Sequence, residues 1–142
     1  LLYGQGLLNV YKPVIDKDGV DLIVLQSGIF HPVHIQVKSR YNVTADGQMI
    51  LTINGNTFQP HYSFYIVAVS FNKQTLEIDN KILFIPSEIV EEKAIRLTNG
   101  NLRIVACLQN GSQNQWCPYI ISKAQLAEKI IEAISEMNKY YR

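Results

Sequence analysis

Residues 19–39 read GVDLIVLQSGIFHPVHIQVKS, with two dense runs of apolar and β-branched residues at positions 20–25 and 33–39. Runs of this composition are typical of strands. Gly28 lies between them, where it can supply the positive φ of a type II′ turn. We therefore expect an antiparallel hairpin centred on Gly28 and Ile29.

The register of this hairpin would bring polar side chains together. Asp21 falls directly opposite Gln36, with Cβ atoms ~5 Å apart, and Lys38 lies on the adjacent diagonal. Because side chains alternate along a strand, these three share one face. The other face collects only apolar residues, namely Leu22, Val24, Val33, Ile35 and Val37. The pattern predicts one core face and one face with three polar groups near one end of the hairpin.

These three polar groups suit metal-assisted hydrolysis. A carboxylate and an amide oxygen a few ångströms apart can hold a hard divalent cation such as Mg²⁺. Asp21 and Gln36 would supply those oxygens, and the backbone carbonyl of Val37 could add another ligand. Lys38 would lie beside the metal, where it could orient an attacking water or stabilise the charge that builds on a scissile phosphate.

The two strands also carry a family resemblance, in residues 19–24 (GVDLIV) and 34–39 (HIQVKS). They resemble the core of the PD-(D/E)XK nuclease superfamily, and are most similar to its Mrr-like and Holliday-junction-resolvase-like branches. The resemblance implies an α/β, restriction-endonuclease-like fold, in which a mixed β-sheet is flanked by helices. It implies hydrolysis of DNA phosphodiester bonds with Mg²⁺ or Mn²⁺. Asp21 would be the metal ligand, Gln36 would replace the usual Glu, and Lys38 would be the catalytic lysine.

The chain departs from the family's pattern in three places. No proline precedes Asp21, and Gln36 replaces a carboxylate, which should weaken metal affinity because the ligand is neutral. Many members also place a Glu on a first helix. We expect residues 1–6 to be the last turn of such a helix, with Gly6 as its C′ residue, so that part of the first helix is missing from this sequence.

Neighbouring polar residues are weaker candidates for substrate binding. His34 shares the face of Gln36, and is interpreted either as a hydrogen-bonded packing residue or as a group acting on metal or substrate. Ser39 and Arg40 end the strand close to Lys38, where they could contact a phosphate or form a solvated strand end. We assign His31 and His61 no role, because nothing in the sequence pairs them. Trp116 and Tyr119 either stack on bases or pack.

The rest of the chain predicts further strands and two helices. Strands are expected over residues 7–14, at a sheet edge because of Pro13, and over 63–71, 81–85 and 102–108. Residues 41–44 and 49–53 flank an Asp-Gly hairpin turn, and Ser87 is expected to cap a short helix. A capping box at Ser122 and Gln125 begins the clearest helix, whose apolar face is Leu126, Ile130, Ile131, Ile134 and Met137. We expect one domain over residues 1–142 with a C-terminal amphipathic helix.

Composition excludes several classes of protein. The 142 residues are 47% apolar and 18% charged, with a formal net charge of +1, so the chain is neither disordered nor a strongly basic coat protein. No apolar run reaches the ~20 residues of a transmembrane helix. Cys107 and Cys117 are too few for a disulfide scaffold and lack a zinc-binding pattern. We expect two free thiols and a cytoplasmic protein with no membrane partner.

Three functions are consistent with the sequence. The first is a metal-dependent endonuclease acting on DNA, in restriction or defence, which could be a homodimer because enzymes that cut both strands often are. The second is a catalytically silent nuclease-fold domain that binds nucleic acid or a partner protein. The third is a structural interaction domain in which Asp21 and Lys38 form only a cross-strand ion pair.

Overall fold

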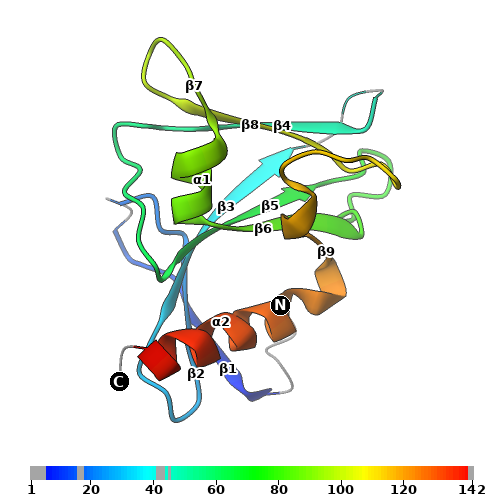
Figure 1. Cartoon of the computed structure of the whole chain (residues 1–142). Coiled ribbons are helices and arrows are strands. Elements are labelled where there is room, and N and C mark those ends of the chain that lie inside the picture. The colour runs from blue at the N-terminus through cyan, green and yellow to red at the C-terminus, as the bar shows by residue number, and fades with distance from the viewer. Residues whose placement is uncertain (1–5, 16–17, 41–43, 45, 141–142) are drawn as a thin grey trace.

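The computed structural model describes residues 6–15, 18–40, 44 and 46–140, and within these the strands form two sheets (Figure 1). The larger sheet has the order β1-β2-β3-β5-β6-β9. Its strands are β1 (Leu8–Tyr11), β2 (Leu22–Gln26), β3 (Val33–Arg40), β5 (Phe64–Ser70), β6 (Lys81–Pro86) and β9 (Ile120–Ser122). Only the β3–β5 pairing within this sheet is parallel, so the sheet is mixed, as predicted.

The smaller sheet and the helices cover the larger sheet on both sides. The smaller sheet contains β4 (Gln48–Ile53), β8 (Leu102–Cys107) and β7 (Ile95–Arg96), in the order β4-β8-β7. The helices are α1 (Ser87–Lys93) and α2 (Leu126–Tyr140), with short 3₁₀ turns at Cys117–Tyr119 and Lys123–Gln125. In Figure 1, α2 lies along one side of the larger sheet, and α1 lies with the smaller sheet on the other.

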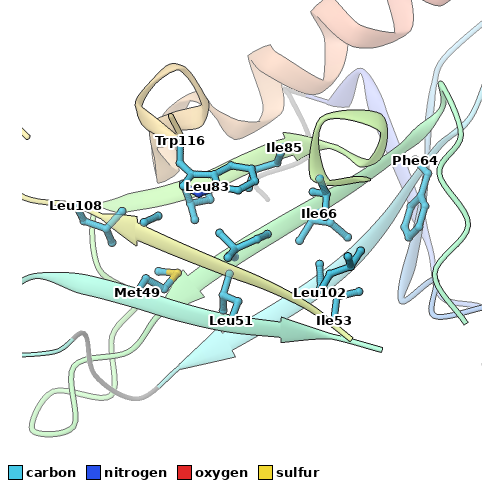
Figure 2. Packing of buried hydrophobic residues seen from close by; sticks show 14 residues of the cluster. Met49, Leu51, Ile53, Phe64, Ile66, Leu83, Ile85, Leu102, Leu108 and Trp116 are labelled. Carbon is cyan, nitrogen blue, oxygen red and sulfur yellow. The ribbon is translucent and has the colours of Figure 1, made fainter. Parts of the chain in front are cut away.

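Two hydrophobic clusters follow from this layering. On one face, Val24, Val33 and Ile35 pack with Ile130, Ile134 and other apolar residues of α2. On the opposite face, apolar side chains of β5 and β6 meet those of the smaller sheet and α1. The residues labelled in Figure 2 belong to this second cluster: Met49, Leu51, Ile53, Phe64, Ile66, Leu83, Ile85, Leu102, Leu108 and Trp116. The larger sheet is therefore the central layer of the molecule.

The predicted register of the β2–β3 hairpin is confirmed from Leu22 to Val24, the predicted pairing of Asp21 with Gln36 is not formed, and the predicted turn type is wrong. Leu22 pairs with Ile35 and Val24 with Val33, as expected. The turn, however, is closed by a bond from Ile29 N–H to the Gln26 carbonyl (3.0 Å), with Gly28 at its third position and φ of 81°. A positive φ at that position defines type II, not type II′. Pairing of β2 with β3 stops at Val24 and Val33, so the turn over residues 26–29 lies inside a longer connection instead of closing a two-residue hairpin loop.

The expected apolar face of the hairpin is correct with one exception. Val24, Val33 and Ile35 are buried, and Leu22 packs partly buried against the same cluster. Val37 is 37% exposed and lies beyond Ile35, the last residue of β3 that pairs with β2.

Outside the hairpin, the edge position of β1 and the capping box before α2 are confirmed, and Ile130, Ile134 and Met137 of α2 are buried. One local prediction is wrong. Ser87 is the first residue of α1 but makes no capping bond, because its hydroxyl is hydrogen-bonded to the backbone of His61. Gly47 N–H donates to the Thr44 carbonyl (2.9 Å), and β4 pairs with β8, far along the sequence. The predicted strand at 41–44 lies outside the described residues except for Thr44. The predicted helix end at 1–6 lies outside them except for Gly6.

Candidate metal centre at the start of β2

Asp21 immediately precedes β2 and is held there by two hydrogen bonds. Its backbone N–H donates to the carbonyl of Ile35 (2.8 Å), the residue that already pairs with Leu22, so Asp21 departs from the register that would set it directly opposite Gln36. Its Oδ2 accepts a bond of 2.6 Å from the backbone N–H of Val37. A carboxylate bonded in this way is strongly oriented, because hydrogen bonds to an ionised group are stronger than neutral ones. Oδ1 makes no further hydrogen bond within the described part of the chain.

The Val37 carbonyl faces the same side as this bond. In a strand, the N–H and C=O of one residue point to the same edge, and successive residues alternate. Since the Val37 N–H meets the Asp21 carboxylate, the Val37 carbonyl also points toward the edge of β3 that β2 leaves uncovered. The Val37 carbonyl and the Asp21 carboxylate therefore lie on the same edge of β3.

Gln36 contributes an oxygen that has no hydrogen-bond partner among the described residues. Its Cα pairs with that of Ile66 in β5, so the side chain lies on the face that leads into the cluster of Figure 2. Its Oε1 is buried and accepts no hydrogen bond from that part of the chain. A buried polar atom without a hydrogen-bond partner lowers folding stability by about 1–3 kcal/mol. In a native protein such an atom needs an explanation, for example a bound water or ion.

Lys38 lies on the same face as Gln36 and is partly buried. It makes no hydrogen bond or ion pair to any residue in the described ranges, Asp21 included. The ion pairs found among those residues are Arg96–Glu91, Lys129–Glu132 and Lys139–Glu136. The cross-strand Asp21–Lys38 ion pair on which the third sequence interpretation depends is therefore not formed.

His34 is engaged by Ser63, at the start of β5. Its Nδ1 lies 3.1 Å from Ser63 Oγ, which also lies 2.8 Å from Nδ1 of His61. Burial lowers the pKa of His34 below its usual value and nearby His61 lowers it further, while the bond to the Ser63 backbone opposes both. His34 thus matches the packing alternative. The expectation that nothing pairs His61 is wrong, since it also bonds Ser87 through its backbone.

The other two candidates for substrate binding, Ser39 and Arg40, are the last residues of β3. Ser39 and Arg40 are both exposed, and Arg40 Nε donates to the Ile50 carbonyl of β4 (2.9 Å). This bond fixes the guanidinium next to the end of β3. Trp116 is only 2% exposed and belongs to the core, so it packs instead of presenting a ring for base stacking. Tyr119 lies partly buried under Lys93, whose Nζ is 5.8 Å from its ring centre.

The donor set at this position fits a hard cation. Across the described ranges, no three or more His, Cys, Asp or Glu side chains group in a way that could hold a metal. A metal at the hairpin would instead meet one carboxylate (Asp21), one amide oxygen (Gln36) and one backbone oxygen (Val37). Oxygen ligands with few charges suit Mg²⁺ or Mn²⁺, which complete their shells with water and phosphate. The buried, unpartnered Gln36 oxygen is the observation that supports this fit.

The sequence also led to predictions about the two cysteines and about the length of apolar runs. Cys107 and Cys117 are both free, as predicted. None of the helices in the described residues is long and apolar enough to cross a membrane.

Comparisons with known proteins identify the fold but not a family. No protein-family model matches the chain, and no curated protein matches it. Among solved structures, the bacterial homing endonuclease I-Ssp6803I aligns with a TM-score of 0.59 and 16% identity, over 95% of this chain and 85% of that one. MepB aligns with a TM-score of 0.41 and 13% identity, over 82% of this chain and 87% of that one, which is too distant to support an argument. The chain is thus a mixed α/β domain with the fold of an endonuclease.

Proposed function

We propose that this chain is a divalent-metal-dependent endonuclease domain of the PD-(D/E)XK type that cleaves DNA. The proposal rests on the motif residues Asp21, Gln36 and Lys38, on their common position at one end of the β2–β3 hairpin, and on the endonuclease fold. The observation that carries it is the buried Gln36 oxygen without a partner in the described structure. A cation bound to this oxygen would satisfy it, and the Asp21 carboxylate at the same end of the hairpin would supply the charged ligand.

Each residue has a distinct role in the proposed reaction. Asp21, Gln36 and the Val37 carbonyl hold Mg²⁺ or Mn²⁺. When bound, the metal would act as a Lewis acid on the phosphate and activate water for attack. Lys38 has no competing partner in the described structure, so its ammonium group is available to orient the attacking water or to stabilise charge on the scissile phosphate.

Substrate contacts would extend along β3 from Lys38. Ser39 is exposed and can donate a hydroxyl hydrogen bond to a phosphate. Arg40 uses Nε to bond Ile50, which leaves its terminal nitrogens for a phosphate of the DNA backbone, and contacts of this kind position a protein without reading sequence. We assign His34 no direct contact, because its Nδ1 already bonds Ser63. Cleavage of both strands would need a second copy of the site, which a homodimer would supply.

The first test is nicking of supercoiled plasmid by wild type and Lys38→Ala, in Mg²⁺ and in Mn²⁺. We expect wild type to nick only with metal, and Lys38→Ala to be slower by at least about 100-fold, the size of effect that loss of a positioned charge or proton-transfer group has on rate. Lys73→Ala is the matched control, since Lys73 is an exposed lysine of the β5–β6 connection. Equal nicking by all three proteins would show that the activity comes from elsewhere.

Gln36 also supports a second function, in which the domain binds DNA or a partner without catalysis. Gln36 is neutral, so the site has only one charged metal ligand among its described residues, and a domain of this kind could bind DNA or a partner without cutting it. Fluorescence anisotropy with labelled duplex and junction DNA separates the two functions. Binding without cleavage in either metal, at high protein concentration, would favour the silent domain.

A further inference from the structure

The loop between β8 and the 3₁₀ turn at Cys117–Tyr119 carries a cysteine at each end. Cys107 is the last residue of β8 and Cys117 is the first residue of the turn, and both are free and partly exposed. The backbone N–H of Asn114 donates to Cys117 Sγ (3.3 Å), and its Nδ2 donates to the Cys107 carbonyl (3.3 Å). Cys117 Sγ donates to the Ser112 carbonyl (3.0 Å), while the Ser112 hydroxyl is hydrogen-bonded to the Cys107 sulfur. The same two loop residues therefore contact both cysteines.

This loop is anchored to the rest of the fold at both ends. The Leu108 N–H donates to the Gly47 carbonyl (2.9 Å), and the Leu108 carbonyl accepts a bond from Lys81 Nζ (2.7 Å). At the other end, Trp116 is a core residue whose backbone N–H donates to Asn114 Oδ1 (2.9 Å). The packed core, and not the loop alone, thus fixes where the two cysteines lie.

The two thiols differ in their hydrogen bonds. Bonds from the Ser112 side chain and from the backbone of Gln109 lower the pKa of the Cys107 thiol below its usual value, while desolvation opposes them. The Ser112 hydroxyl accepts from Asn114 Nδ2 (3.3 Å), which leaves its proton for the sulfur. These groups stabilise the thiolate, the nucleophilic form of cysteine. Cys117 Sγ instead donates its proton to a carbonyl, a bond that favours the neutral thiol.

We infer that Cys107 and Cys117 form an oxidation site for hydroperoxides, in which Cys107 reacts with the peroxide and Cys117 then closes a disulfide to it. The inference is carried by the juxtaposition of two unequal thiols on the same pair of loop residues, Ser112 and Asn114. To close the disulfide, Cys117 Sγ gives up its bonds to these two residues. The site uses no residue of the candidate metal centre, so the inference stands apart from the proposed function.

Two steps account for the atoms and electrons. The Cys107 thiolate attacks one oxygen of the peroxide, the O–O bond breaks, and Cys107 becomes a sulfenic acid. The other oxygen leaves as hydroxide or alkoxide and takes a proton from water. The Cys117 sulfur then attacks the Cys107 sulfur, the S–O bond breaks, and water leaves with the proton of the Cys117 thiol. The two sulfurs together lose one electron pair, which the peroxide gains.

The test treats the whole chain, freed of reductant, with a slight excess of hydrogen peroxide and follows the intact mass. Wild type should lose two hydrogens, run as a monomer on a non-reducing gel and recover its mass with dithiothreitol. Cys117→Ser should instead accumulate a sulfenic acid at Cys107, which dimedone traps. In Cys107→Ser, the remaining thiol should react at least about tenfold more slowly than Cys107 does in Cys117→Ser, because it lacks the bonds that stabilise a thiolate.

Ser112→Ala tests the source of the difference between the thiols. This change removes the hydroxyl that bonds Cys107 and keeps the carbonyl that Cys117 contacts. In the Cys117→Ser background, the pH at which alkylation by iodoacetamide reaches half its maximal rate should rise by about 0.5–1, since a bond to the thiolate is lost. Gln113→Ala, at an exposed position of the same loop, is the matched control and should leave this pH unchanged.

Several outcomes would overturn the inference. Wild type that keeps both thiols in peroxide would do so. Oxidation of Cys107 to a sulfinic acid with Cys117 still reduced, or disulfides formed only between chains, would show that Cys117 does not reach Cys107. Equal rates for the two single thiols would show that Cys107 is not the preferred nucleophile. None of these outcomes bears on the nicking of DNA, which the plasmid assay decides independently.

Discussion

The side-chain oxygen of Gln36 is buried with no hydrogen-bond partner in the described structure. The sequence pattern made this residue a candidate metal ligand, but it could not show that its oxygen lacks a partner. It also could not show that Lys38 stays apart from Asp21. Asp21 lies just before β2, where its Oδ2 accepts a bond from the Val37 N–H and forms no ion pair with Lys38.

At this scale we predict that Gln36→Met stabilises the fold and abolishes metal binding. Methionine has a similar length and removes the unsatisfied oxygen, so the free energy of unfolding should rise by about 1 kcal/mol, the lower end of the cost of such an atom. Urea denaturation in EDTA measures the stability, and calorimetry with MnCl₂ measures the binding. Gln26→Met is the matched control for stability, since Gln26 also buries an unpartnered Oε1 among the described residues but lies at the far end of β2. Lower stability in Gln36→Met would contradict the prediction.

Between elements, β5 and β6 are joined by an aromatic pair on the face that α2 covers. The rings of Tyr65 and Phe84 stack with centres 4.6 Å apart and an interplanar angle of 14°. Burial raises the pKa of the Tyr65 phenol above its usual value of 10.0, and the charge of Glu88 on α1 raises it further. The folded state therefore keeps the phenol protonated at a pH where the unfolded chain would release the proton.

We predict that this difference destabilises the fold in alkali. Because the pKa is raised on folding, the folded state holds more protons than the unfolded state around and above the usual tyrosine pKa of about 10, and stability falls as the pH rises through that range. Stability should be unaffected by this group at lower pH. The measurement is urea denaturation at about pH 8, 9.5 and 10.5 for wild type and Tyr65→Phe, which keeps the stack. The variant should lose less stability than wild type over this range, and Tyr140→Phe, at an exposed tyrosine, should behave like wild type.

At the scale of the whole molecule, Gln36 of the proposed site and helix α2 lie on opposite faces of the larger sheet. Val33 and Ile35 of β3 pack toward α2, whereas the side chain of Gln36 lies on the other face. In Figure 1, α2 lies across the larger sheet from α1 and the smaller sheet. The helix therefore holds β3 in place without taking part in the site.

We predict that Ile134→Ala, on the buried face of α2, weakens the fold but not the site. Ile134 is fully buried, so its truncation should cost about 2–5 kcal/mol of unfolding free energy. Metal affinity of the protein that remains folded should stay within about twofold of wild type, since the change lies beyond the sheet. Ser135→Ala, at an exposed position of the same helix, is the control for stability. A large loss of affinity in folded Ile134→Ala would show that α2 shapes the site through β3.

The sequence by itself determined those features that depend on neighbouring residues. Apolar alternation predicted β2, β3 and their register, and the capping box at Ser122 predicted where α2 begins, because both signals act over a few residues. The tertiary structure decided the rest. Pairing of β2 with β3 stops at Val24 and Val33, which leaves Gly28 in a longer connection, and β4 pairs with β8, which no local turn signal could reveal. Contacts between distant segments depend on how whole elements pack.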